Sequence, residues 1–160
     1  MSKRFLVASL LGLVVSLGAA TQATAATSHA FGYDVFRQID RTFDDGQANL
    51  TYQVSVGRRS ALVAGFALGD DYQVYEAGFK RYNEKYLSGT FFQLGAAYWR
   101  GDVNDSDLGA DLRLGYELPV NRWMVLSGAV SLLYGIDLPT SQAKGEDLHV
   151  RPHLGFKVHF

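Results

Sequence analysis

The chain has 160 residues, enough for one domain, and carries 15 basic and 16 acidic side chains but no cysteine. This balance of charge argues against a nucleic-acid partner, because a nucleic-acid binder needs a surplus of Lys and Arg to neutralise phosphates. The lack of cysteine excludes a disulfide framework, so packing, hydrogen bonds or a membrane must supply the stability.

Residues 1–26 have the pattern of a cleaved secretory signal peptide. Residues 2–4 form a basic start, residues 5–17 are mostly apolar, and residues 23–25 offer small side chains for cleavage. A retained membrane anchor is the alternative, but it would need about 20 apolar residues. Loss of Lys3 and Arg4 reduces the 15 basic side chains to 13, against 16 acidic ones. The predicted mature chain, residues 27–160, contains no apolar run long enough for a transmembrane helix.

The stretch before residue 46 fits either a strand or a helix. Apolar residues at 31, 33 and 35 alternate with Gly32 and Asp34, as in a strand. A competing interfacial helix would place four apolar side chains on one face: Val35, Phe36, Ile39 and Phe43. Parity favours the strand, because seven strand patterns follow it and a bacterial single-chain barrel has an even number of strands.

After residue 46 the chain alternates between apolar and polar residues with a period of two. The alternation is clearest over 108–118 and 148–160, and weaker over 47–56, 60–68, 72–82, 86–99 and 123–135. The two clear segments exceed the usual 5 or 6 residues of a soluble strand and match the roughly 10 residues that a tilted strand needs to cross a bilayer. The sequence therefore predicts an all-β fold, an antiparallel up-and-down transmembrane β-barrel of about eight strands.

The two faces of the strands differ in a way that suggests which one meets lipid. A small barrel has a crowded interior, so glycines should face inward and leucines outward. Leu112, Leu114, Leu154 and Phe156 would then contact lipid tails. The inward face would hold a network of paired charges: Glu76, Lys80, Asp111, Arg113, Glu117, Arg151 and Lys157. The alternatives are solvated side chains on a half-buried sheet, and a secreted binding barrel with its apolar face inside.

Aromatic residues and connections support the membrane interpretation. We expect two interfacial girdles, formed by Tyr72, Tyr82, Tyr86, Tyr98, Trp99, Tyr116, Trp123 and Tyr134. Tight turns at 57–59, 83–85 and 119–122 contrast with longer polar loops at 101–107 and 136–146. Outer-membrane barrels keep short turns in the periplasm and longer loops outside. The predicted outer loops are rich in Asp, and divalent cations could bridge them to lipopolysaccharide phosphates.

The C-terminal segment carries a family resemblance. Residues 154–160 alternate and end in an aromatic residue, with Phe156, Val158 and Phe160 on one face. This resembles the last strand of outer-membrane barrels, which often have an aromatic third from the end, where Val158 stands here. The mature chain as a whole resembles the small OmpA-like and OmpX-like barrels. The resemblance implies a monomer in the outer membrane of a Gram-negative bacterium, in contact with lipids and lipopolysaccharide, whose C-terminal residues are read by the outer-membrane assembly machinery.

Candidate chemistry in the sequence is sparse. His149, His153 and His159 share the inward face of one strand, but the first two lie about 13 Å apart along it and cannot share one metal ion. Asp102, Asn104 and Asp107 offer oxygen ligands at a loop without the glycine and glutamate of an EF-hand. His149 with Ser141 and Asp137 is a weak candidate for a catalytic set. The sequence indicates no cofactor.

These observations favour a non-enzymatic outer-membrane barrel that supports the envelope or presents its loops for surface interaction. One alternative is an enzyme that modifies lipid A or phospholipid, like the barrel acylases and deacylases that share this architecture. The other is a narrow, porin-like channel, since eight strands enclose a space that side chains nearly fill.

Overall fold

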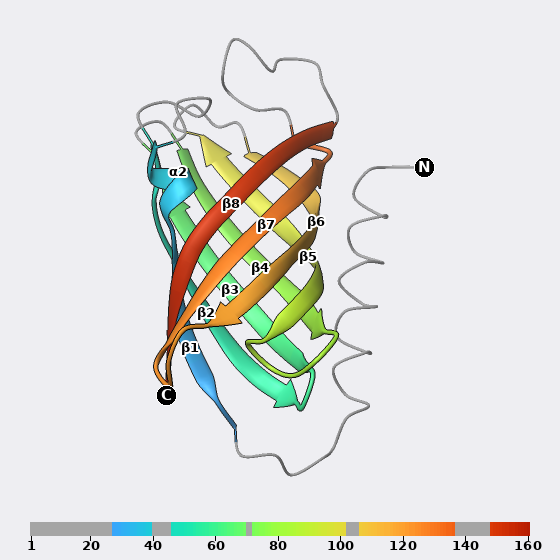
Figure 1. The fold of residues 1–160 in the computed structure, drawn as a ribbon. Helices are drawn as coiled ribbons and strands as arrows, with labels where there is room; N and C mark the ends of the chain where they lie inside the picture. The colour runs from blue at the N-terminus through green and yellow to red at the C-terminus, as the bar shows by residue number, and fades with distance from the viewer. Residues whose placement is uncertain (1–26, 40–45, 70–71, 102–105, 137–147) are drawn as a thin grey trace.

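In the computed structural model the described residues, 27–39, 46–69, 72–101, 106–136 and 148–160, form a closed antiparallel β-barrel (Figure 1). Each strand pairs with the next along the chain, and the last pairs with the first. The strands are β1 (His29–Asp34), β2 (Ala48–Gly57), β3 (Ser60–Leu68), β4 (Tyr72–Tyr82), β5 (Gly89–Gly101), β6 (Ser106–Pro119), β7 (Met124–Tyr134) and β8 (Leu148–His159). The prediction of an all-β, up-and-down barrel of eight strands is confirmed.

The strand and the helix predicted as alternatives for the segment before residue 46 are each partly right. Residues 29–34 form β1, and the helix α2 (Val35–Ile39) follows directly. Asp34 ends the strand and begins the helix, because its carboxylate accepts hydrogen bonds from the backbone N–H groups of Phe36 and Arg37, at 3.0 and 3.4 Å. This is the capping role that Asp commonly has at the start of a helix. Phe43 lies outside the described residues.

The two ends of the barrel differ. Connections 58–59, 83–88 and 120–123 lie at the end where β1 starts and β8 finishes, and we call this the turn end (Figure 1). Helix α2 lies at the opposite end, which we call the loop end. Among the described residues, no helix has the length and hydrophobicity to cross a membrane.

Alternation along each strand separates two environments. On β6, Asp111 and Glu117 are buried inside, whereas Leu108, Leu114 and Leu118 are exposed outside. On β8, Arg151, His153 and Lys157 are buried and the residues between them are largely exposed. The barrel therefore has a polar interior and an apolar exterior.

Paired glycines let the wall of the barrel bend. Gly78 of β4 and Gly95 of β5 are register partners. A Cβ added to Gly95 would lie 2.5 Å from the carbonyl oxygen of Ala77, and one added to Gly78 would lie 2.9 Å from the carbonyl oxygen of Leu94. Only glycine fits this close approach of neighbouring backbones.

The predicted aromatic girdles need correction. Tyr72, Tyr82 and Trp99 are almost fully buried inside the barrel. They occupy the same strand face as the inward residues beside them, because Tyr72 and Tyr82 share the parity of Glu76 and Lys80. The assignment of these three aromatics to the outer surface is wrong. Tyr86 is part-buried and packs against buried residues at the turn end, so it does not belong to an outer girdle either. The predicted aromatics that do lie exposed on the outside are Tyr98, Tyr116, Trp123 and Tyr134.

The seam between the first and last strands is short. β1 has six residues, compared with 13 in β5 and 14 in β6. Residues 30–34 of β1 pair with residues 155–159 of β8. Beyond the ladder, Asp34 continues the contact, since its carboxylate accepts the backbone N–H of Leu154 at 3.3 Å.

Candidate functional site

The interior near the turn end is organised around one carboxylate. Glu117 of β6 is fully buried, and its Oε1 accepts hydrogen bonds from Lys80 Nζ at 2.8 Å and Lys157 Nζ at 2.6 Å. Its Oε2 accepts the hydroxyl of Tyr82 at 2.8 Å. Gln53 completes the group, accepting from Lys157 and donating to Tyr82. Two ammonium groups thus share one carboxylate.

The side of Lys80 away from this carboxylate faces an aromatic ring. Its Nζ lies 3.8 Å from the centroid of the Phe91 ring, which gives the ammonium a cation–π contact. This contact matters because the cluster holds one more positive than negative charge.

A second charged cluster lies nearer the loop end. Glu76 of β4 pairs with Arg37 of α2 and, at 3.5 Å, with Arg113 of β6. Arg113 also pairs with Asp111 at 2.8 Å. Arg37 is nearly fully buried although it belongs to a connection, so α2 turns its guanidinium into the barrel. The ion pair with Glu76 holds the helix at the loop end of the barrel.

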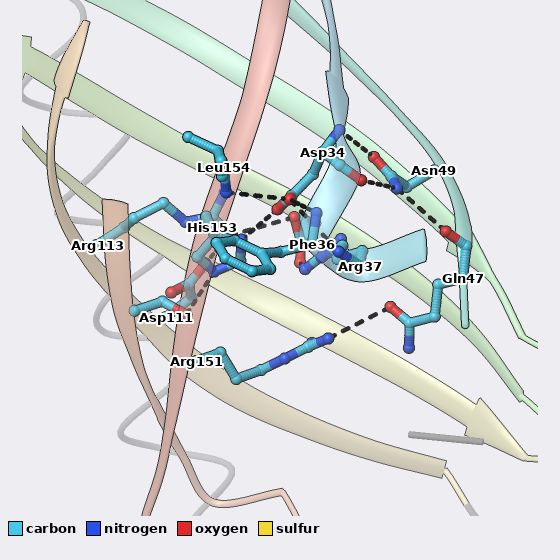
Figure 2. A network of polar contacts seen from close by, with 12 residues as sticks. Asp34, Phe36, Arg37, Gln47, Asn49, Asp111, Arg113, Arg151, His153 and Leu154 are labelled. Atoms are coloured by element: carbon cyan, nitrogen blue, oxygen red, sulfur yellow. Dashed lines mark hydrogen bonds and ion pairs between the residues drawn. The ribbon is translucent and has the colours of Figure 1, made fainter. Parts of the chain in front are cut away.

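Asp34 joins α2 to the two strands that flank β1 (Figure 2). Besides capping the helix, its Oδ2 lies 2.5 Å from Nδ1 of His153 on β8. The amide of Asn49 on β2 donates to its backbone oxygen and accepts from its backbone N–H, both at 2.8 Å. Asp34 therefore ties the helix to strands on either side of β1.

His153 links Asp34 to a serine. Its Nε2 lies 2.8 Å from the hydroxyl of Ser131 on β7. A carboxylate only accepts hydrogen bonds, so in a neutral ring Nδ1 carries the proton and Nε2 accepts from the serine. This is the order of contacts found in Ser–His–Asp triads. Ser131, however, is almost fully buried inside the barrel.

A small cavity lies between the two charged clusters. It has a volume of about 50 Å³, and its lining includes His153 and the charged side chains of Arg37, Lys80, Arg113 and Lys157. A water molecule needs roughly 10–15 Å³ of such space, so the cavity has room for a few waters.

Aromatic and apolar side chains fill the interior towards the loop end. Tyr72 stacks on Trp99 with ring centroids 5.3 Å apart, and Arg151 lies over Trp99 at 5.5 Å. His149 is also inside, with its Nε2 3.0 Å from the backbone oxygen of Ile136. This group covers the charged cluster beneath it.

The turn end is covered by the connection between β4 and β5. Leu87 is buried against Ala30 and Val125, with a positive φ of 62°. The hydroxyl of Tyr86 donates to the backbone oxygen of Gln53 at 3.2 Å. Burial raises the pKa of Tyr86 above its usual range, so the phenol stays protonated and keeps this bond. Side chains therefore fill both ends of the described interior.

The structure brings together most of the residues proposed for the internal network. Glu76, Asp111 and Arg113 meet in one cluster and Lys80, Glu117 and Lys157 in the other. Arg151 is inside too, 3.5 Å from the side-chain oxygen of Gln47. The C-terminal residues Phe156, Val158 and Phe160 lie exposed on the outer surface.

Other sequence candidates are separated or fall outside the described residues. Ser141 and Asp137, proposed with His149, and Asp102 and Asn104, proposed with Asp107 as metal ligands, belong to segments that the structure does not describe. Within the described ranges, no group of three or more His, Asp or Glu side chains is arranged to hold a metal ion.

Sequence reasoning missed the residues that α2 contributes. Arg37 looks like an ordinary exposed residue of a connection, and only the fold turns it inward. Asp34 carried a readable signal, because Asp directly before a helical stretch is a common cap. The inward position of Ser131 follows from strand parity, but its contact with His153 depends on the register between β7 and β8.

Comparison of the chain with protein-family models, with curated proteins and with solved structures finds no match.

Proposed function

We propose that the protein is a membrane-spanning barrel of the Gram-negative outer membrane, which supports the envelope or displays its loops at the surface and has no enzymatic activity. The observation that carries this proposal is the inverted distribution of side chains. Leu154 is 50% exposed on the outside, whereas its neighbours on the other face, His153 and Lys157, are buried. A soluble barrel does the reverse, because water solvates the outer face and apolar side chains fill the core.

The exposed apolar surface is continuous around the barrel. Large hydrophobic side chains are exposed on every strand, among them Phe31, Leu50, Phe66, Tyr75, Phe92, Leu114, Val130 and Leu154. Soluble monomers rarely expose apolar patches of more than a few hundred Å². A hydrocarbon environment removes the cost of this surface.

Polar groups on the outer face lie where a membrane would end. The charged residues that face outward from described strands are Arg81 and Arg100, each one residue from the end of its strand. Tyr98 and Tyr134 lie near the loop end, and Tyr116 and Trp123 near the turn end. These positions fit two interfacial belts with an apolar band between them.

The filled interior favours a structural or surface role over a wide channel. Ion pairs and aromatic side chains occupy much of the described lumen, and the cavity between the two charged clusters has a volume of only about 50 Å³. An eight-stranded barrel is just wide enough for its own side chains. Specificity would then lie with the loops, as is usual for scaffolds of this kind.

Two measurements on the mature protein test the membrane assignment. Folded outer-membrane barrels resist detergent, so we expect the refolded protein to shift in electrophoresis on boiling and to float with vesicles. Leu154→Asp should reduce the fraction of protein that inserts, while the conservative control Leu154→Ile should not. A soluble, heat-insensitive protein that also tolerates Leu154→Asp would overturn the proposal.

An acyl-transfer enzyme is the second candidate, favoured by the contacts of Ser131, His153 and Asp34. Ser131 is almost fully buried, so a carbonyl could reach it only if inner side chains moved aside, such as Arg37, which lines the same cavity as His153. We would expose lipid-embedded protein to a fluorophosphonate probe. Labelling that disappears in Ser131→Ala would support this candidate, and equal lack of labelling in both proteins, also with Arg37→Ala added, would reject it.

A further inference from the structure

The outer surface near the turn end has a hollow with a mixed lining. Its volume is about 440 Å³. Arg59, Arg81, Asn83 and Thr90 supply polar groups, and Phe92 and Leu114 are among its apolar residues. The hollow therefore combines two guanidinium groups with an apolar surface.

The strand register produces this combination. Arg81 of β4 pairs with Phe92 of β5, which pairs with Leu114 of β6, so the three lie side by side across the outer wall. Arg59 stands in the neighbouring β2–β3 turn, and its backbone oxygen accepts the N–H of Tyr82 at 2.7 Å. The edge of the hollow is thus fixed by backbone hydrogen bonds.

The two guanidinium groups lack an acidic partner among the described residues. Arg81 donates to the hydroxyl of Ser60 at 3.1 Å, which leaves most of its donors free for another acceptor. No described carboxylate lies within 4.0 Å of Arg59 or Arg81. The connections at the turn end contain three more basic residues, Arg58, Lys85 and Arg122, and one acidic residue, Glu84. The turn end of the barrel therefore carries a positive electrostatic potential.

A guanidinium beside an apolar outer wall lies close to lipid head groups if the wall lies in a membrane. Charged side chains at the edge of a bilayer extend towards the head groups, where phosphate is the available acceptor. Arg binds phosphate through two parallel hydrogen bonds, which makes it well suited to this contact. Phe92 and Leu114, exposed at 41% and 57%, offer the adjoining surface for an acyl chain.

We propose that this hollow binds one anionic phospholipid of the leaflet at the turn end, with its phosphate between Arg59 and Arg81 and the start of an acyl chain on Phe92 and Leu114. The inference rests on the proposed membrane location. It adds a defined headgroup site to that location.

Native mass spectrometry of the detergent-refolded protein tests the site. The protein is incubated with equal amounts of phosphatidylglycerol and phosphatidylcholine, and the retained adducts are counted. We expect preferential retention of phosphatidylglycerol, reduced about tenfold in Arg59→Gln/Arg81→Gln because two charge-assisted contacts are lost. The control Arg122→Gln removes an exposed charge from another turn, beside Trp123, and should keep the adduct.

The outcomes separate the site from the membrane assignment. Protein that inserts into vesicles but retains both lipids equally, or loses the adduct equally in Arg122→Gln, overturns the headgroup site alone. Inorganic phosphate that competes fully with the lipid at equal concentration identifies a free-anion site and overturns the lipid assignment. Protein that stays soluble, does not shift on boiling and tolerates Leu154→Asp overturns the proposed function, and this site with it.

Discussion

Replacing Glu117 with Gln removes the one carboxylate that neutralises two buried ammonium groups. Gln keeps the shape and an acceptor oxygen but leaves Lys80 and Lys157 without a counter-charge, at 3% and 8% exposure. Removal of one partner of a buried ion pair costs about 3–5 kcal/mol. Because the remaining hydrogen bonds retain part of the interaction, we expect a loss of about 3 kcal/mol, roughly a hundredfold in the unfolding equilibrium constant.

The assay is reversible unfolding in urea of protein refolded into lipid vesicles, followed by tryptophan fluorescence. Trp99 is buried in the lumen, so its emission reports loss of the interior. Glu84→Gln is the matched control, since this exposed turn carboxylate should contribute less than about 1 kcal/mol. The triple variant Glu117→Gln/Lys80→Met/Lys157→Met removes the unpaired charges and should recover most of the loss.

A loss below about 1 kcal/mol for Glu117→Gln, equal to that of the control, would refute the reasoning. It would mean that water enters the cluster around Glu117 and solvates the ammonium groups. Failure of the triple variant to recover stability would instead show that the loss does not come from the uncompensated charges.

Three further predictions concern the wall and the loop end of the barrel. Leu154→Arg, at the middle of β8, should lower the free energy of unfolding in vesicles by about 2–4 kcal/mol. Gln73→Arg, which faces outward near the end of β4, should lower it by only about 0–1 kcal/mol, and equal losses would contradict a lipid-facing band. Gly95→Val should destabilise the barrel by about 1–3 kcal/mol in the same assay, because its Cβ would clash with the carbonyl oxygen of Ala77. An unchanged urea midpoint would show that the neighbouring backbones can move apart at no cost. Arg37→Ala removes the ion pair with Glu76, so it should release α2 and speed the hydrogen exchange of the helix's backbone amides. Protection equal to that of the wild type would show that the buried ion pair does not hold the helix.

The sequence contained enough information for the barrel because one signal is repeated in every strand. Alternation with a period of two identifies strands and assigns each residue to a face. That rule placed Glu76 and Arg113 inside, and the described structure has them there. The same alternation rule also places Tyr82 and Trp99 inside, where the structure has them. The expectation of aromatic girdles conflicts with the rule at these two residues, and it is wrong there.

The contacts of α2 were beyond what local sequence can supply. Arg37 finds Glu76 across 39 positions of chain, and Asp34 finds His153 across 119. Such pairs depend on the barrel diameter and the strand register. A single sequence does not reveal either quantity unless a known structure supplies them. Asp34 as a helix cap was accessible to local reasoning, whereas its second contact was not.

The short seam between β1 and β8 has a consequence for how the molecule forms. The first strand of the chain must wait for the last, since Ala30 pairs with His159. Each intervening strand can pair with the strand before it in the sequence. Joining the chain ends instead requires closing a loop that spans nearly the whole domain, at an entropic cost that the few backbone bonds of a six-residue strand must repay. The bonds from Asp34 to His153 and Leu154 form only when those ends meet, so they stabilise the finished cylinder and not the curved sheet that precedes it.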